Sequence, residues 1–132
     1  MIFTIDVKTD SKTEMIDITQ EVSDAVKKSG VKSGIAVVFI PHTTAAVTIN
    51  ENADPAVKMD MLYEINKVIP FNDNYKHCEG NSAAHIKTSL FGPSLSVIFE
   101  NGELILGTWQ DIYFAEFDGP RNRKAYIKIV AG

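Results

Sequence analysis

The chain contains only two arginines, Arg121 and Arg123, whereas its lysines are scattered along almost the whole length. A guanidinium is a planar, permanently charged donor that can bind a phosphate or a carboxylate through two parallel hydrogen bonds. In an extended segment the two side chains would lie on one side, so together they could hold one phosphate. The alternative is that they neutralise the nearby carboxylates of Glu116 and Asp118. The sequence leaves both interpretations open.

Three histidines, His42, His77 and His85, lie in or beside predicted bends and loops rather than in the interior of a helix or strand. Histidine transfers protons near neutral pH and is the most common metal ligand in proteins. Their spacing does not place two ligands on one element, so a zinc site would have to be assembled from separate segments. A loop residue that makes a single hydrogen bond is the alternative for each of them.

Two further segments carry side chains that could contact a ligand. Asn50 and Glu51 precede a predicted helix start, where Glu51 could act as a general base or could simply interact with the helix dipole. The segment Gly107–Gln110 holds the only tryptophan. Its glycine could let the backbone approach a ligand, and Trp109 could form a flat wall, although an indole is more often part of a core.

The spacing of apolar residues predicts the elements that position these side chains. Residues 3–7 alternate as a half-buried strand, and residues 14–17 are expected to pair with it in a hairpin. Helical spacing predicts a helix over residues 20–29, closed by Gly30. The continuous apolar run over residues 35–40 predicts a central strand that is covered on both faces.

The rest of the chain predicts a second helix and a series of strands. After a strand over residues 45–49, Asp54 and Pro55 are typical of a helix start, and Pro70 ends that helix. The polar stretch 71–84 is expected to be a long loop. The later expectations are a hairpin with Asn101-Gly102 as its turn, between strands 95–99 and 104–106, and two more strands over 112–117 and 125–130.

This order of elements predicts an α+β fold with two helices and a predominantly antiparallel sheet or sandwich system. With 132 residues, the chain is expected to form a single domain, residues 1–132, that buries a sizeable core.

Composition and charge narrow the classes of function. The formal net charge of −4 argues against nucleic-acid binding and against anionic membranes, both of which normally need a basic face. No apolar stretch approaches the length of a membrane span and no secretory signal is visible, so a cytoplasmic location is expected. The single cysteine, Cys78, cannot form an internal disulfide, which is consistent with a reducing compartment.

Taken together, several segments resemble the YjbQ-like family, often labelled secondary thiamine-phosphate synthases. The resemblance extends over almost all of the chain from Ile35 onward, and Gly-Thr-Trp-Gln is its most specific element. The matching segments, in chain order, are His42–Ala45, Asn50–Asn52 with Asp54–Pro55, His77, His85–Gly92, Gly107–Gln110, and Arg121 with Arg123.

The resemblance implies a small α+β subunit that assembles as a homotrimer, with a pocket near a subunit boundary. The activity it implies is thiamine-phosphate synthesis, in which a pyrimidine diphosphate is joined to a thiazole phosphate and pyrophosphate is released. The expected partner is a small phosphorylated substrate or a phosphate- or sulfate-like anion. The alternative is a non-catalytic trimer that binds a metabolite or a metal.

These considerations assign expected roles to individual residues. His85 and Glu51 are the expected catalytic residues, with His85 as the acid or base. His42, His77 and His85 are the expected ligands of a divalent metal, zinc or magnesium. Substrate binding is expected from His42, Thr43, Thr44, Asn50, Asn81, Gly107, Thr108, Trp109, Gln110, Arg121 and Arg123.

Overall fold

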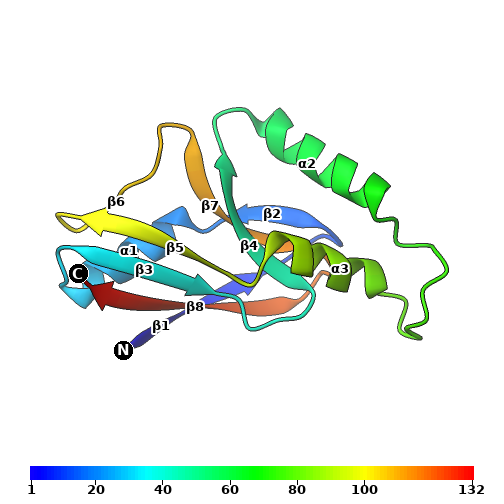
Figure 1. The fold of residues 1–132 in the computed structure, drawn as a ribbon, viewed down its shortest axis with the longest axis horizontal. Helices are drawn as coiled ribbons and strands as arrows, with labels where there is room; N and C mark the ends of the chain where they lie inside the picture. The colour runs from blue at the N-terminus through cyan, green and yellow to red at the C-terminus, as the bar shows by residue number, and fades with distance from the viewer.

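The structure is a computed structural model that describes all residues from Met1 to Gly132, and its α+β fold contains two antiparallel sheets and three helices (Figure 1). The five-stranded sheet has the order β1-β8-β3-β5-β6, and the three-stranded sheet has the order β2-β7-β4. The strands are β1 Ile2–Lys8, β2 Glu14–Asp17, β3 Gly34–Phe39, β4 Ala45–Glu51, β5 Ser94–Glu100, β6 Glu103–Leu104, β7 Gln110–Glu116 and β8 Asn122–Ala131. The helices are α1 Thr19–Ser29, α2 Pro55–Val68 and α3 Ser82–Phe91.

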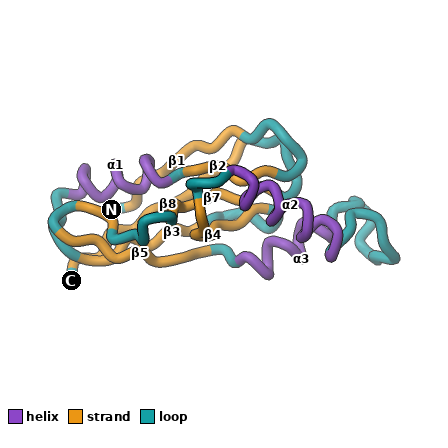
Figure 2. The backbone as a smooth tube through the Cα atoms, turned by 90° about the horizontal axis from the view of Figure 1, so that it is seen from above, coloured by secondary structure: helices purple, strands orange, loops and turns teal.

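The main hydrophobic core lies between the two sheets and α1. It includes alternate residues of the strands, such as Val38 and Ile127, and the buried face of α1, where Val22 and Val26 are fully buried. Figure 2 shows α1 along one side of the strands, with α2 and α3 grouped at the other end of the molecule. Burial of these apolar side chains is the principal force that holds the two sheets together.

The outer face of the five-stranded sheet is not covered. Its exposed apolar side chains, which we call the outer apolar face, are Ile2, Ile35, Phe39, Ile98 and Val130. The expectation that residues 35–40 form a strand covered on both faces is therefore wrong for this chain. The strand is central in its sheet, but its side chains alternate between the core and the surface.

The three-stranded sheet is covered on its second face by α2 and α3. The buried residues of this smaller cluster include Tyr113, Ala115 and Phe117, and Met61 and Ile65 of α2 pack against it. Asp54 accepts a hydrogen bond from the backbone N–H of Ala56 and Pro55 occupies the first turn, as predicted. No side chain of α2 is fully buried, so this helix is attached only through partly buried contacts.

Two local predictions are confirmed by backbone geometry. Asn101 and Gly102 have φ values of 52° and 75°, which suits the two central positions of a type I′ turn, and they join β5 to β6. Gly30 has a φ of 72° at the end of α1, where its N–H bonds to the carbonyl of Lys27.

Two other predictions are wrong. The expected opening hairpin does not form, because β1 pairs with β8 and β2 pairs with β7 in the other sheet. The expected loop over residues 71–84 ends earlier, because α3 begins at Ser82, so the fold has a third helix and His85 lies on it. None of the helices is long and apolar enough to cross a membrane.

Candidate functional site

A pocket of about 810 Å³ lies where the two sheets meet the start of α3. It gathers residues from the bend between β3 and β4, from the segment before α3, from α3 itself, and from the turn between β7 and β8. Most of the side chains that the sequence predicts for the site line it. These are His42, Thr43, Thr44, His77, Asn81, His85, Arg121 and Arg123, together with Asp118 and Glu79.

The guanidinium of Arg123 is buried and forms hydrogen bonds with other side chains of the protein. Its guanidinium donates two hydrogen bonds to the carboxylate of Glu116, from Nε at 2.8 Å and from Nη2, and Nη2 also donates to Oγ1 of Thr44 at 2.8 Å. Glu116 is fully buried and also accepts hydrogen bonds from Oγ1 of Thr9 and the backbone N–H of Asp118. The alternative interpretation, neutralisation of Glu116, therefore holds for Arg123, and of the two arginines only Arg121 keeps an exposed guanidinium.

Arg121 pairs with Asp118 but stays exposed at the pocket. Its Nε donates to the backbone carbonyl of Asp118 at 2.8 Å, and its Nη2 donates to Oδ2 at 3.1 Å. The same carboxylate also accepts hydrogen bonds from Lys12 and from Asn81. Burial alone would raise the pKa of Asp118, but the donors Asn81, Arg121 and Lys12 outweigh it and hold the pKa below its ordinary value. Because the side chain of Arg121 is 53% exposed and keeps Nη1 free of these bonds, it can still donate to a ligand.

His42 has a defined orientation. Its Nε2 accepts a hydrogen bond from the backbone N–H of Lys124 at 2.9 Å, so the neutral ring carries its proton on Nδ1. Burial lowers the pKa of His42, the nearby Arg123 lowers it further, and Glu116 acts in the opposite direction. His42 is therefore a neutral hydrogen-bond donor at neutral pH.

His77 and His85 lie next to each other in the pocket. Their rings meet edge to face, with 5.5 Å between ring centroids. Nε2 of His77 lies 3.9 Å from Oε2 of Glu79, a distance that suits an ion pair when the imidazole is protonated. The three histidines thus meet at one pocket within a single chain. No three His, Cys, Asp or Glu side chains are grouped closely enough to hold a metal ion, so this arrangement does not reproduce the expected metal site.

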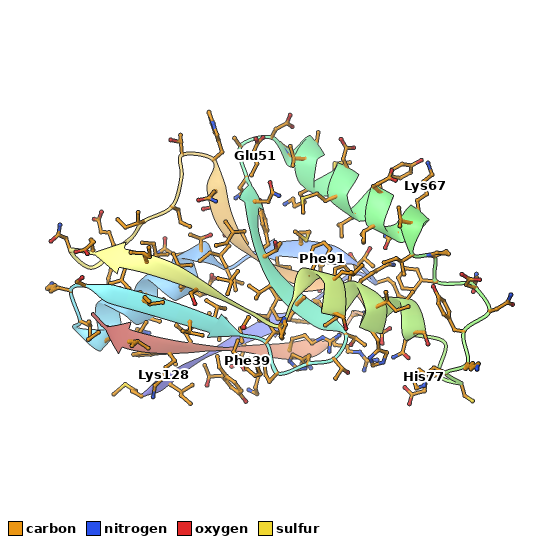
Figure 3. The ribbon with its side chains drawn as sticks, in the orientation of Figure 1. Phe39, Glu51, Lys67, His77, Phe91 and Lys128 are labelled. Atoms are coloured by element: carbon orange, nitrogen blue, oxygen red, sulfur yellow. The ribbon has the colours of Figure 1, made fainter.

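The other predicted site residues form a separate group at the opposite end of β4 and β7. Glu51 and Asn50 lie at the end of β4, where the strand register places them opposite Gln110 and Asp111. Figure 3 shows Glu51 at the start of α2, far from His77. Glu51, Asn50, Gly107, Thr108, Trp109 and Gln110 therefore do not line the histidine pocket in this chain, and Trp109 is 62% exposed rather than a pocket wall.

Sequence reasoning missed the acidic members of the site. It treated Glu116 and Asp118 only as possible partners for the arginines, whereas Asp118 lines the pocket and Glu116 lies directly behind it. The short spacing between these carboxylates and the two arginines, around the Gly119-Pro120 turn, was the signal that could have placed them together.

The sequence is similar to one family of proteins over almost its whole length. The sequence model of the family described as UPF0047 protein YjbQ-like matches residues 3–132. The chain is 55% identical to the UPF0047 protein YugU of Bacillus subtilis over 131 residues, covering 98% of this chain and 99% of that protein. It is 53% identical to the UPF0047 protein MJ1081 of Methanocaldococcus jannaschii over 130 residues, covering 98% and 94%.

Solved structures show the same fold. A crystal structure of a YjbQ/UPF0047 protein from Clostridium acetobutylicum has a TM-score of 0.96 and 58% identity, covering 97% of this chain and 99% of that one. A structure from Sulfolobus solfataricus, described as a YbjQ-like protein of unknown function, has a TM-score of 0.95 and 33% identity, covering 100% and 97%.

These comparisons overturn the expected thiamine-phosphate synthase activity. The relatives described above are named only as UPF0047 or YjbQ-like proteins, and the Sulfolobus protein is described as being of unknown function. The geometry of the site adds a physical reason. One of the two guanidiniums expected to bind phosphate groups is occupied by Glu116, and the carboxylate expected to act as a base, Glu51, lies outside the pocket.

Proposed function

The chain belongs to the UPF0047 YjbQ-like family, and we propose that its histidine pocket binds a small oxyanion, a phosphate or carboxylate group, and that His85 donates a hydrogen bond to the bound molecule. The observation that carries this proposal is the meeting of three imidazoles and the exposed Arg121 at one pocket. Imidazole and guanidinium groups are strong donors to anionic oxygens.

The arrangement of hydrogen-bond donors supports an anionic ligand. The buried charge of Glu116 is offset by Arg123, whereas the single carboxylate of Asp118 faces two cations, Lys12 and Arg121. His42 adds a neutral donor whose direction is fixed by Lys124. Glu79 also lines the pocket and brings its carboxylates and cations to equal numbers. An oxyanion would therefore be bound through the directed donors of Arg121 and His42, not through an excess of positive charge.

Binding of inorganic phosphate tests this proposal. Replacing Arg121 by methionine is expected to weaken binding about tenfold or more, because a charge-assisted hydrogen bond is lost. His85→Ala is expected to weaken phosphate binding as well, because a hydrogen-bond donor to the anion is lost.

Lys124→Met is the matched control for Arg121→Met. It also removes one cation, but the side chain of Lys124 pairs with Asp6 outside the pocket. Equal losses of affinity in both variants would show a general effect of net charge and contradict the proposed site, as would phosphate binding that neither variant changes.

We further propose that copies of the chain associate through the outer apolar face, as the homotrimer implied by the family resemblance. Its five side chains are each at least 42% exposed, and the strand register places Ile98, Ile35 and Val130 directly opposite one another. A cluster of exposed apolar side chains is typical of protein interfaces. Phe39 belongs to this face and also lines the pocket. Association would therefore place a second copy beside the anion site.

Ile98→Lys is expected to convert the assembly from three chains to one, because a charge would have to be buried in an apolar interface. Light scattering coupled to gel filtration measures the mass. Met59→Lys, at an equally exposed apolar position on α2, is expected to leave the assembly intact. A wild-type protein that is a single chain at micromolar concentration would refute the proposal.

A further inference from the structure

Lys87 is the only lysine whose side chain is fully buried. Its Nζ donates a hydrogen bond to Oδ1 of Asn66 at 2.7 Å and lies 3.7 Å from the centroid of the Phe71 ring. Lys12 lies over the same ring at 5.0 Å, and no salt bridge joins Lys87 to a carboxylate. A buried cation is thus held by one amide and one aromatic face, instead of by a counter-ion.

The partners of Lys87 lie in the least buried part of the chain. Asn66 is near the end of α2, a helix without a fully buried side chain, and Phe71 lies three residues beyond the last residue of that helix. From Ile69 to Gly80 no residue is fully buried, and the only side-chain hydrogen bonds within this stretch are those of Asp73 and Tyr75. The contacts at Lys87 are therefore a principal attachment of this stretch to the rest of the molecule.

The stretch 69–81 also supplies one wall of the histidine pocket. His77, Glu79 and Asn81 all line the pocket. At its far end the stretch is held by the hydrogen bond from Asn81 to Asp118. His77 thus lies between two attachments, one at Asp118 and one at Lys87, and its own ring adds a contact with His85 on α3.

The energetic role of such a buried charge differs from that of an apolar residue. Removing an ammonium from water is costly, and a cation–π contact with one hydrogen bond offsets only part of that cost. An apolar side chain of similar length could give equal or greater global stability. What the ammonium adds is direction, because its hydrogen bond and its place over the ring fix where Asn66 and Phe71 lie relative to α3.

We propose that Lys87 is a positioning residue that fixes the stretch 69–81 against α3 and thereby holds His77 and Asn81 at the pocket. Its predicted effect on anion binding rests on the function proposed above. Its predicted effect on the order of the stretch does not.

Lys87→Met is the primary test. Trypsin cleavage after the exposed Lys76, measured by mass spectrometry without any anion, is expected to become faster on the order of tenfold, because the cation–π contact and the hydrogen bond that hold this stretch are both lost. The urea midpoint of global unfolding is expected to stay close to that of the wild type, while affinity for inorganic phosphate falls. Lys67→Met, at an exposed lysine in the last turn of α2, is the matched control and is expected to change none of the three.

Variants of Phe71 separate positioning from simple packing. Phe71→Tyr keeps the aromatic face and is expected to be cleaved like the wild type. Phe71→Leu is expected to be cleaved faster than the wild type but no faster than Lys87→Met, because it keeps the hydrogen bond from Lys87 to Asn66. Because both substitutions remove the same cation–π contact, the double variant should be no faster than Lys87→Met. If Lys87→Met does not fold, Phe71→Leu still provides the test.

The outcomes separate this role from the proposed function. An unchanged cleavage rate in Lys87→Met, or multiplied effects in the double variant, would overturn the positioning role. Faster cleavage of Lys87→Met, together with a wild type that does not bind phosphate, would support the positioning role and overturn the anion site.

Discussion

Replacing Arg123 by methionine is expected to lower the free energy of unfolding by about 3–5 kcal/mol, because it leaves an ionised carboxylate buried without its partner. Glu116 is fully buried and Arg123 is only 6% exposed, so water cannot take the place of the lost guanidinium. The hydrogen bond from Arg123 to Thr44 is lost as well. Urea unfolding followed by circular dichroism measures the change.

Glu116→Gln is expected to have an effect of similar size, since it leaves the guanidinium without a counter-charge. The double variant should lose clearly less free energy of unfolding than the two single variants lose together, because no uncompensated charge remains in it. The exposed pair Lys124–Asp6 provides the control, and Lys124→Met should cost less than about 1 kcal/mol. If each single variant lost less free energy of unfolding than Lys124→Met, the buried pair would not contribute to stability.

The same pair gives a pH dependence of defined sign. Burial alone would raise the pKa of Glu116, but hydrogen bonds from Arg123, Asp118 and Thr9 hold the pKa below its ordinary value. A carboxyl group whose pKa is lowered by folding stabilises the protein above its unfolded-state pKa, and this contribution is lost as the pH falls through the folded-state value. The stability difference between the wild type and Glu116→Gln should therefore shrink below about pH 4.

Gly119→Ala is expected to destabilise the fold by roughly 1–3 kcal/mol or more, through steric overlap beside the pocket. A Cβ atom at this position would lie 2.2 Å from the carbonyl oxygen of Ser11, 2.8 Å from Oγ1 of Thr9 and 2.9 Å from Cγ of Glu116. The backbone oxygen cannot move without disturbing the turn between β1 and β2. The change should also displace Arg121 and weaken phosphate binding, measured by calorimetry alongside urea unfolding.

Gly107→Ala is the control for this substitution. The nearest atom to its Cβ would be Oε1 of Gln110, the end of a flexible side chain, at 3.2 Å. It should leave both stability and phosphate affinity close to those of the wild type. Equal stability of the two variants would contradict the close packing seen at Gly119.

The elements that the sequence predicts correctly depend on neighbouring residues alone. The turn at Asn101-Gly102 and the end of α1 at Gly30 need only a backbone of positive φ, and Asp54 with Pro55 starts α2 through its own first turn. The predicted opening hairpin is wrong because the pairing of β1 depends on a distant part of the chain. The partner of β1 is β8, more than a hundred residues away, and no local pattern encodes that choice.

The missed helix and the divided site have physical explanations as well. The buried face of α3 consists of Ala83, Ala84, Lys87 and Thr88, so the usual apolar period is absent. The pocket gathered all three histidines, because the bend after β3, the start of α3 and the turn after β7 meet at one end of the sheets. Glu51 and Trp109 are held apart from it because strands β4 and β7 carry them to the opposite end.

The place of β8 in its sheet has a consequence for synthesis on the ribosome. This strand lies between β1 and β3, which have no hydrogen bonds with each other. A nascent chain therefore holds both neighbours without the strand that joins them until β8 itself has emerged, and pairing between such distant segments is intrinsically slow. The guanidiniums of Arg121 and Arg123 reach their places in the pocket only when β8 pairs with these neighbours.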